Sequence, residues 1–270
     1  SDYISVNFVS RIFDNPALYS GLENLLGIYG YALQLYCDFS GYSDMAIGIA
    51  LWMGFEIPAN FRAPYKSDSI TDFWRRWHIS LSSWLRDYLY ISLGGNRKGR
   101  LRMYFNLFLT MLLGGLWHGA SWNFVIWGSV HGFALGVHKR FRELLGHDRH
   151  YQSTGIRRFF AVLLTFHLVC FCWLFFAGTS FEASMQMIGQ ICSNFNPQLL
   201  PQFLEGYPLV SALMAGGFVL HFLPTAWNGK AESLAGRTPL LAQAVLLALM
   251  IFLVVQVKGS EVHPFIYFKF

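Results

Sequence analysis

Long apolar segments alternate with shorter polar ones along most of this 270-residue chain. Nearly all of them are close to the roughly 20 residues that a helix needs to cross a bilayer. The pattern predicts an all-α, polytopic transmembrane protein with a single membrane-embedded domain over residues 1–270. The apolar segments are residues 25–55, 103–120, 121–139, 159–177, 208–223 and 239–257.

Residues 69–93, between the first two apolar segments, have the period of an amphipathic helix. An interfacial helix with its tryptophans at headgroup level explains the arginines on the polar face. It does not explain a histidine on the apolar face. The apolar face holds Trp74, Trp77, His78, Leu81, Trp84, Leu85, Tyr88 and Leu89, and the polar face holds Arg75, Arg76, Ser80, Ser83, Arg86 and Asp87.

A second histidine stands near the end of a glycine-rich apolar stretch, LLGGLWHGA, at residues 112–120. Gly115 and Gly119 form a small-xxx-small pair, which lets another helix approach closely in lipid. An ionisable side chain inside a membrane segment marks a functional site by default. We therefore expect His118 to be functional; the alternative is a histidine that only supports packing through a hydrogen bond to a neighbouring carbonyl.

Residues 121–139 carry a second face of small residues, Gly128, Gly132 and Gly136, which predicts another close helix contact. His131 precedes Gly132 as His118 precedes Gly119. We expect His131 to support the site and not to react itself.

Two carboxylates, Asp38 and Asp44, interrupt the first apolar segment. Charges inside a membrane span are costly, so these groups should face protein or a water-filled cavity. Metal binding, proton movement and a structural role as acceptors for nearby arginines all remain open from the sequence.

Composition agrees with a membrane protein, because 54% of the residues are hydrophobic and 13% are charged, against about 25% charged in soluble domains. The net charge of +5 gathers in loops at residues 94–102 and 139–158. The positive-inside rule places both loops in the cytoplasm, and nothing here favours nucleic acid. The chain begins at Ser1 without a signal segment, so we expect a fragment whose N-terminal helices are missing.

Four motifs follow one another in order: DFSGYSD at residues 38–44, FWRRWHISLS at 73–82, WLRDY at 84–88 and GGLWHG at 114–119. Together they closely resemble the membrane-bound O-acyltransferase family, and the nearest branch looks like the bacterial alginate O-acetyltransferases and teichoic-acid D-alanyl transfer proteins. The resemblance is dense from about residue 31 to residue 132.

The resemblance implies a polytopic helical protein of the plasma membrane without a metal. It implies that His118 is the principal catalytic histidine and His78 the second one of the active site. Residues expected to support them are Trp77, Trp117, Asp38, Asp44, Arg76, Asp87 and His131.

Acyl transfer to a hydroxyl needs a base for the proton and donors where the carbonyl oxygen becomes negative. We expect His118 to be that base and His78 to orient the donor or stabilise the oxyanion, while Trp77 and Trp117 exclude water. The thioester donor, acetyl-CoA or an acyl carrier protein, comes from the cytoplasm, and the basic residues 97–102 are candidates to attract its phosphates. No tightly bound cofactor is expected, and the cofactor-binding residues are unknown.

The final residues, FIYFKF at 265–270, resemble a terminal motif of cell-envelope acylation systems. The resemblance implies that Tyr267 accepts the acyl group and passes it to an extracytoplasmic transferase, the expected partner that would acylate a cell-envelope polymer. An aromatic membrane anchor is the alternative reading of Tyr267.

Two other functions remain open. Intramembrane histidines and aspartates also relay protons in transporters and lipid flippases, although we find no internal repeat of the kind that many transporters have. A non-catalytic scaffold that recruits a periplasmic acyltransferase is the second alternative.

Overall fold

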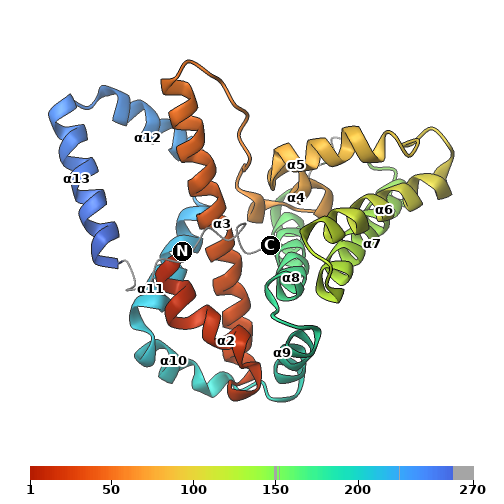
Figure 1. Cartoon of the computed structure of the whole chain (residues 1–270), viewed down its shortest axis with the longest axis horizontal. Helices are drawn as coiled ribbons and strands as arrows, with labels where there is room; N and C mark the ends of the chain where they lie inside the picture. The colour runs from red at the N-terminus through yellow and green to blue at the C-terminus, as the bar shows by residue number, and fades with distance from the viewer. Residues whose placement is uncertain (149–150, 152, 225, 258–270) are drawn as a thin grey trace.

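The computed structural model describes residues 1–148, 151, 153–224 and 226–257, and every regular element in this part of the chain is helical. This confirms the all-α prediction for the described residues. The longest helix, α3 (Gly21–Trp52), stands at the centre of Figure 1. The other long helices are α6 (Arg100–His118), α7 (Trp122–Leu144), α8 (Gly155–Ala177), α9 (Phe181–Ser193), α11 (Pro208–Phe222), α12 (Ala226–Arg237) and α13 (Leu240–Val257).

Short helical pieces connect the long helices. The chain enters through α1, a π-helical turn and α2, which pack against α3, and α10 leads into α11. These pieces are α1 (Asp2–Ile4), η1 (Ser5–Val9), α2 (Ser10–Asp14), η2 (Pro16–Leu18), η3 (Pro64–Lys66), η5 (Pro197–Leu199) and α10 (Leu200–Gly206).

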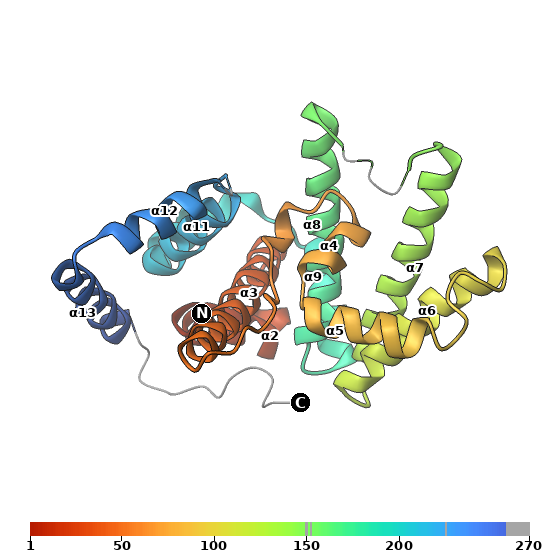
Figure 2. The ribbon, with the colours of Figure 1, turned by 90° about the horizontal axis from the view of Figure 1, so that it is seen from above.

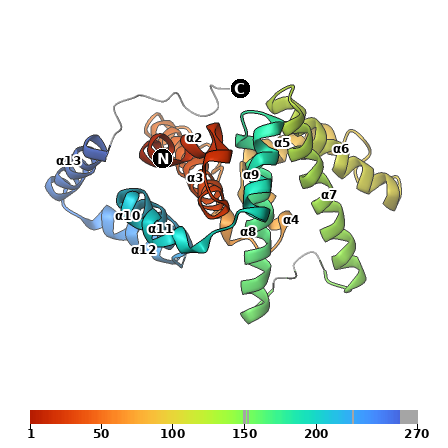
Figure 3. The same cartoon turned by 90° about the horizontal axis from the view of Figure 1, so that it is seen from below.

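Among the described residues, only α8 is by itself long and apolar enough to cross a membrane. α10 and α11 meet the same criterion only together, and they bend by 106° at their junction. α13 carries a shorter apolar stretch, is exposed along nearly its whole length, and lies apart from the other long helices except α12 in Figures 1, 2 and 3. The spans predicted over residues 159–177, 208–223 and 239–257 thus correspond to helices of unequal length.

α6 and α7 form an antiparallel hairpin, and α8 lies between this hairpin and α3 (Figures 2 and 3). Glycines bring the hairpin helices together. A Cβ added at Gly128 would lie 2.5 Å from the carbonyl oxygen of Met111, and one added at Gly132 would lie 2.9 Å from the Cα of Phe108. The close packing predicted from the glycine spacing is confirmed at these two positions.

Gly128→Ala is expected to destabilise the hairpin, because its methyl group would overlap a main-chain oxygen that cannot move without shifting α6. Overpacking of this kind costs about 1–3 kcal/mol. Gly136→Ala is the matched control on the same face, since its Cβ would lie 3.7 Å from a ring carbon of Tyr104, an ordinary contact. Thermal unfolding of both variants in detergent is the measurement; equal melting temperatures would contradict the packing.

The segment predicted as one helix over residues 69–93 is broken, so that prediction is wrong. It consists of α4 (Ile70–Arg76), α5 (Ile79–Trp84) and a π-helical turn, η4 (Leu85–Tyr90). His78 lies at the break with φ 42° and ψ 58°, in the left-handed region.

The loop before α4 holds this break open. The main-chain oxygen of Asn60 accepts a hydrogen bond from the Ile79 amide at 3.0 Å, and its side-chain oxygen accepts one from the Ser80 amide at 3.1 Å. The first amides of a helix have no partner inside the helix, so an outside acceptor is needed. Asn60 provides two, and a new helix begins at α5.

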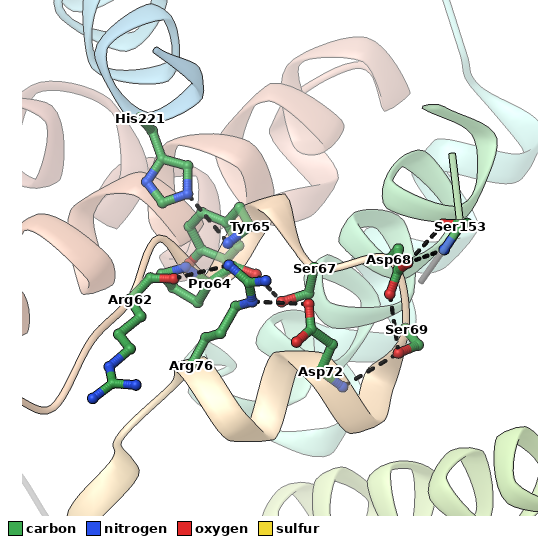
Figure 4. Close-up of polar contacts among 10 residues, drawn as sticks. All are labelled: Arg62, Pro64, Tyr65, Ser67, Asp68, Ser69, Asp72, Arg76, Ser153 and His221. Carbon is green, nitrogen blue, oxygen red and sulfur yellow. Dashed lines mark hydrogen bonds and ion pairs between the residues drawn. The ribbon is translucent and has the colours of Figure 1, made fainter. Parts of the chain in front are cut away.

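The same loop is anchored to two distant parts of the chain (Figure 4). The main-chain amide of Tyr65 donates to Nε2 of His221 on α11 at 3.2 Å. The carboxylate of Asp68 accepts hydrogen bonds from the amide and the hydroxyl of Ser153, just before α8, at 3.0 and 2.6 Å. Burial raises the pKa of the Asp68 carboxyl, but the two bonds from Ser153, the charge of Arg158 and the Ser69 hydroxyl together outweigh it, and the net pKa lies below its usual value. α4 is therefore fixed relative to α8 and α11.

Candidate active site

His118 is the last residue of α6 and lies among aromatic rings. Its side chain is 6% exposed. The ring centroids of Trp117 and Phe176 lie 5.0 Å from the imidazole, that of Trp127 5.4 Å and that of Phe124 6.1 Å away. These rings come from α6, α7 and α8, so three helices build the wall around one histidine.

His78 occupies the break between α4 and α5. A residue other than glycine in the left-handed region is uncommon, although histidine is among the types found there more often. The ring of Phe39, on α3, lies edge-on to the imidazole at 4.7 Å, and the Ser80 hydroxyl lies 3.3 Å from Nδ1. Strained positions of this kind cluster at functional sites.

Both histidines line one small cavity of about 10 Å³, which is about the space that one water molecule needs. The two imidazoles, which are 40 positions apart in the sequence, therefore face the same cavity. The other residues that line this cavity are Leu35, Trp74, Trp77, Leu81, Trp127, Trp173 and Phe176.

Of the two tryptophans expected to exclude water, only Trp77 lies in the cavity wall. It is 3% exposed, whereas Trp117 is 65% exposed and contacts His118 from outside the cavity. His131 is fully buried behind the cavity, where its Nδ1 accepts a hydrogen bond from the Trp74 indole at 3.2 Å. His131 therefore positions the wall residue Trp74, and the supporting role predicted for it stays a prediction.

The charged residues expected to support the site lie outside the cavity. Arg76 pairs with Asp72 at 2.8 Å within α4, and Asp87 pairs with its exposed neighbour Arg86 at 2.7 Å. Asp38 is half-buried on α3, and Asp44 is exposed on the last turns of α3. In the described part of the chain Asp44 makes no ion pair with an arginine. Within the DFSGYSD motif, it is the ring of Phe39 that packs against His78.

Much of the wall could not be recognised in the sequence. Trp173 and Phe176 lie in an apolar run on α8 where no pattern distinguishes them from lipid-facing residues. Trp127 is one more aromatic residue of α7. These three residues are identified as part of the site only because the fold brings them, from distant parts of the chain, to the cavity that both histidines line.

A larger cavity of about 730 Å³ lies beside the small one, and Trp74 lines both. It is framed by α4, η4, α6 and α7. The cations of the loop at residues 97–102, expected to attract the donor, do not line it. The cations that do are Arg75, Arg86, Lys139 and Arg142, together with His138 and His147.

Within the described residues, no three His, Cys, Asp or Glu side chains lie close enough together to hold a metal ion. Metal binding by the Asp38 and Asp44 pair therefore has no third ligand there. Tyr267 lies outside the described residues, so its role as an acyl carrier stays a prediction from the sequence.

The elements that carry both histidines and the cavity wall coincide with the region matched by one family model. The membrane-bound O-acyltransferase family matches residues 25–177, more than half of the chain. The chain belongs to this family, and it is accordingly a membrane protein.

Individual relatives act on different polymers, according to their names. A protein of Pseudomonas putida named "Probable alginate O-acetylase AlgI" is 40% identical over 268 residues, covering 91% of this chain and 53% of its own. A peptidoglycan O-acetyltransferase of Helicobacter pylori is 44% identical over 184 residues, covering 68% and 34%. A teichoic acid D-alanyltransferase of Bacillus subtilis is 36% identical over 171 residues, covering 60% and 42%. The chain thus spans about half or less of each relative.

Proposed function

We propose that this chain forms the acyl-transfer centre of a multi-pass plasma-membrane enzyme that moves an acyl group, acetyl in the first instance, from a cytoplasmic thioester to a cell-envelope polymer. The observation that carries the proposal is the pair of imidazoles, His118 and His78, on one cavity inside a wall of aromatic side chains. An imidazole is the side chain best suited to proton transfer near neutral pH. The family match and the names of the relatives support the same reaction.

In the proposed reaction, His118 takes the proton of the acceptor hydroxyl while the hydroxyl oxygen attacks the thioester carbonyl carbon. The new C–O bond forms, the carbonyl oxygen becomes negative, and His78 stabilises that charge or orients the donor. The C–S bond then breaks, and the imidazolium of His118 returns the proton to the leaving sulfur. The aromatic wall excludes water, which would otherwise hydrolyse the thioester.

The basic 730 Å³ cavity is the proposed entrance for the donor. Arg75, Arg86, Lys139 and Arg142 line it, and arginine and lysine both bind phosphate groups, which coenzyme A and the phosphopantetheine arm of a carrier protein both contain. Trp74 separates this cavity from the histidines, so the acyl group would have to pass it.

Both basic loops are expected to face the cytoplasm. The hydroxyl of Tyr104 near the start of α6 donates to Glu143 near the end of α7 at 3.0 Å, so the two loops lie at the same end of the hairpin. Lys98→Cys and Thr154→Cys, both at exposed positions, should be labelled from the cytoplasmic side only. Thr154 is preferred to its neighbour Ser153 as the labelling position, because Ser153 is buried and donates a hydrogen bond to Asp68. Labelling of either cysteine from outside would overturn this orientation.

The full-length protein in vesicles tests the proposed function directly. Thioester cleavage should depend on an added polymer or transferase acceptor and should leave the acyl group on that acceptor. Assembly with a periplasmic transferase but no thioester cleavage would instead favour the scaffold. Proton-coupled movement of a lipid or solute without acyl transfer would favour the transporter.

A further inference from the structure

A second, apolar groove of about 620 Å³ lies outside the acyl-transfer site, between α3, α8 and α11. On α8 its wall is formed by Phe159, Val162, Leu163 and Phe166, which recur at the spacing of one helix face. Phe222 adds to it from the end of α11. Large apolar grooves of this kind mark binding sites.

Of the side chains that the structure describes, two cations also line this groove and no carboxylate does. Arg158 stands on the first turn of α8, and Lys66 belongs to η3. Asp68 is close enough for the charge of Arg158 to lower its pKa, but its carboxylate accepts bonds from Ser153 and does not line the groove. The groove is therefore apolar along its length and positively charged at two points.

Lys66 is held in place from the protein side. Its ammonium group donates to the main-chain oxygen of Leu223, just after α11. Burial, and then the charge of Arg76, lower the pKa of Lys66, and a negative charge placed beside the ammonium group would stabilise its protonated form. An ammonium group has three protons to donate, which leaves donors for a further acceptor.

The position of Arg158 fits a membrane–water boundary. α8 has 23 residues and is therefore about 34 Å long, slightly more than the roughly 30 Å of the hydrocarbon core. A crossing of the bilayer by α8 would therefore place its first turn at headgroup level. From there the groove follows α8 for nine residues, about 13 Å, to His167, whose Nε2 lies 2.7 Å from the hydroxyl of Tyr29. This pairing closes the inner end without an unsatisfied polar group facing the apolar wall.

We infer that this groove binds one anionic phospholipid, with the phosphate on Arg158 and Lys66 and an acyl chain along the phenylalanines of α8. Basic pockets between membrane helices bind anionic headgroups in this way. A bound lipid would join α3, η3, α8 and α11 at the loop that holds α4. A zwitterionic lipid satisfies the apolar wall equally well but leaves the excess positive charge uncompensated.

The test uses the full-length protein in nanodiscs of phosphatidylcholine with and without phosphatidylglycerol, and native mass spectrometry counts the retained lipids. We expect phosphatidylglycerol to be retained and to raise the melting temperature. Arg158→Gln should weaken that binding about fivefold, the effect of about 1 kcal/mol for one cation at a membrane surface. Arg157→Gln is the matched control, because Arg157 lies over the ring of Tyr151 and does not line the groove.

Four results would overturn the inference. The first is equal retention of phosphatidylcholine, and the second is an equal loss in Arg157→Gln. The third is competition by soluble glycerol phosphate, which would indicate an anion site without a lipid chain. If Arg158→Gln lowered the melting temperature as much in pure phosphatidylcholine, the groove would be covered by another part of the protein and not by lipid.

Discussion

His118→Gln in the full-length protein is expected to lower acyl transfer by about 10²–10⁴-fold, the contribution that a general base makes. Glutamine fills much of the space of the imidazole but cannot take a proton from the acceptor hydroxyl. His118→Ala should lose as much activity and some stability as well, because it leaves a void between Phe176 and Trp127. Thioester cleavage per folded molecule is the measurement, with the folded amount taken from size-exclusion chromatography.

A second buried histidine provides the control for His118. His221 is about equally buried, but it accepts a hydrogen bond from the Tyr65 amide and lies outside the cavity. His221→Leu, which removes the acceptor, should therefore cost about 1–3 kcal/mol of stability through an unsatisfied amide and leave the activity of the folded protein within a few-fold. If His118→Gln behaved in the same way, the packing interpretation of His118 would be correct.

The parts of the fold that could be predicted from the sequence depend on neighbouring residues. The spacing of Gly128 and Gly132 predicts close packing, because two glycines on one helix face leave no Cβ atoms there and let the backbone of another helix approach. The sequence also places a boundary between the apolar segments 103–120 and 121–139, and in the structure α6 ends close to it, at His118, while the Ser121 hydroxyl accepts a hydrogen bond from the Asn123 amide at 3.2 Å and caps α7. These signals are local, so no other part of the chain is needed to read them.

The break at His78 could not be predicted in this way. The apolar period of 3.6 residues continues through Trp74, Trp77 and Leu81 without interruption, and no proline or glycine marks the end of α4. The main chain breaks because Asn60 offers oxygen acceptors at that point. A tertiary contact therefore overrides a continuous helical pattern, and the predicted helix face is divided: Trp77 is buried while Trp84 is exposed.

The sequence singled out the two histidines and Trp77, which the structure brings to one cavity, and missed most of the remaining wall. Its reactive groups stand in sequence contexts that are unusual for a membrane segment, whereas its wall consists of aromatic residues that are common in such a chain. Asp38 and Asp44 stand out because charge is rare in an apolar segment, whereas Arg76 and Asp87 were expected as supports because of the family motifs. Arg76 and Asp87 instead form local ion pairs. The exposed pair of Asp87 with Arg86 contributes little energy.

The backbone of His78 provides the second large test, because it separates the imidazole from the conformation of the chain. An L-residue in the left-handed region costs about 1–2 kcal/mol, and glycine avoids that cost. His78→Gly should therefore be more stable than His78→Ala, because both lose the ring and its contact with Phe39 but only alanine keeps the cost of the left-handed backbone. His78→Asn keeps a side chain that tolerates this conformation.

All three substitutions remove the imidazole, so all three should lower acyl transfer by about 10²–10³-fold, the usual loss when one oxyanion donor is removed. Thioester cleavage per folded molecule and the melting temperature are measured on the same samples. The ranking of the melting temperatures measures the cost of the left-handed backbone conformation. The loss of activity shared by all three variants measures the contribution of the imidazole to the reaction. Activity that recovers in His78→Gly and His78→Asn but not in His78→Ala would show that His78 serves the cavity through its main-chain conformation, and the role of its imidazole in the reaction would have to be abandoned.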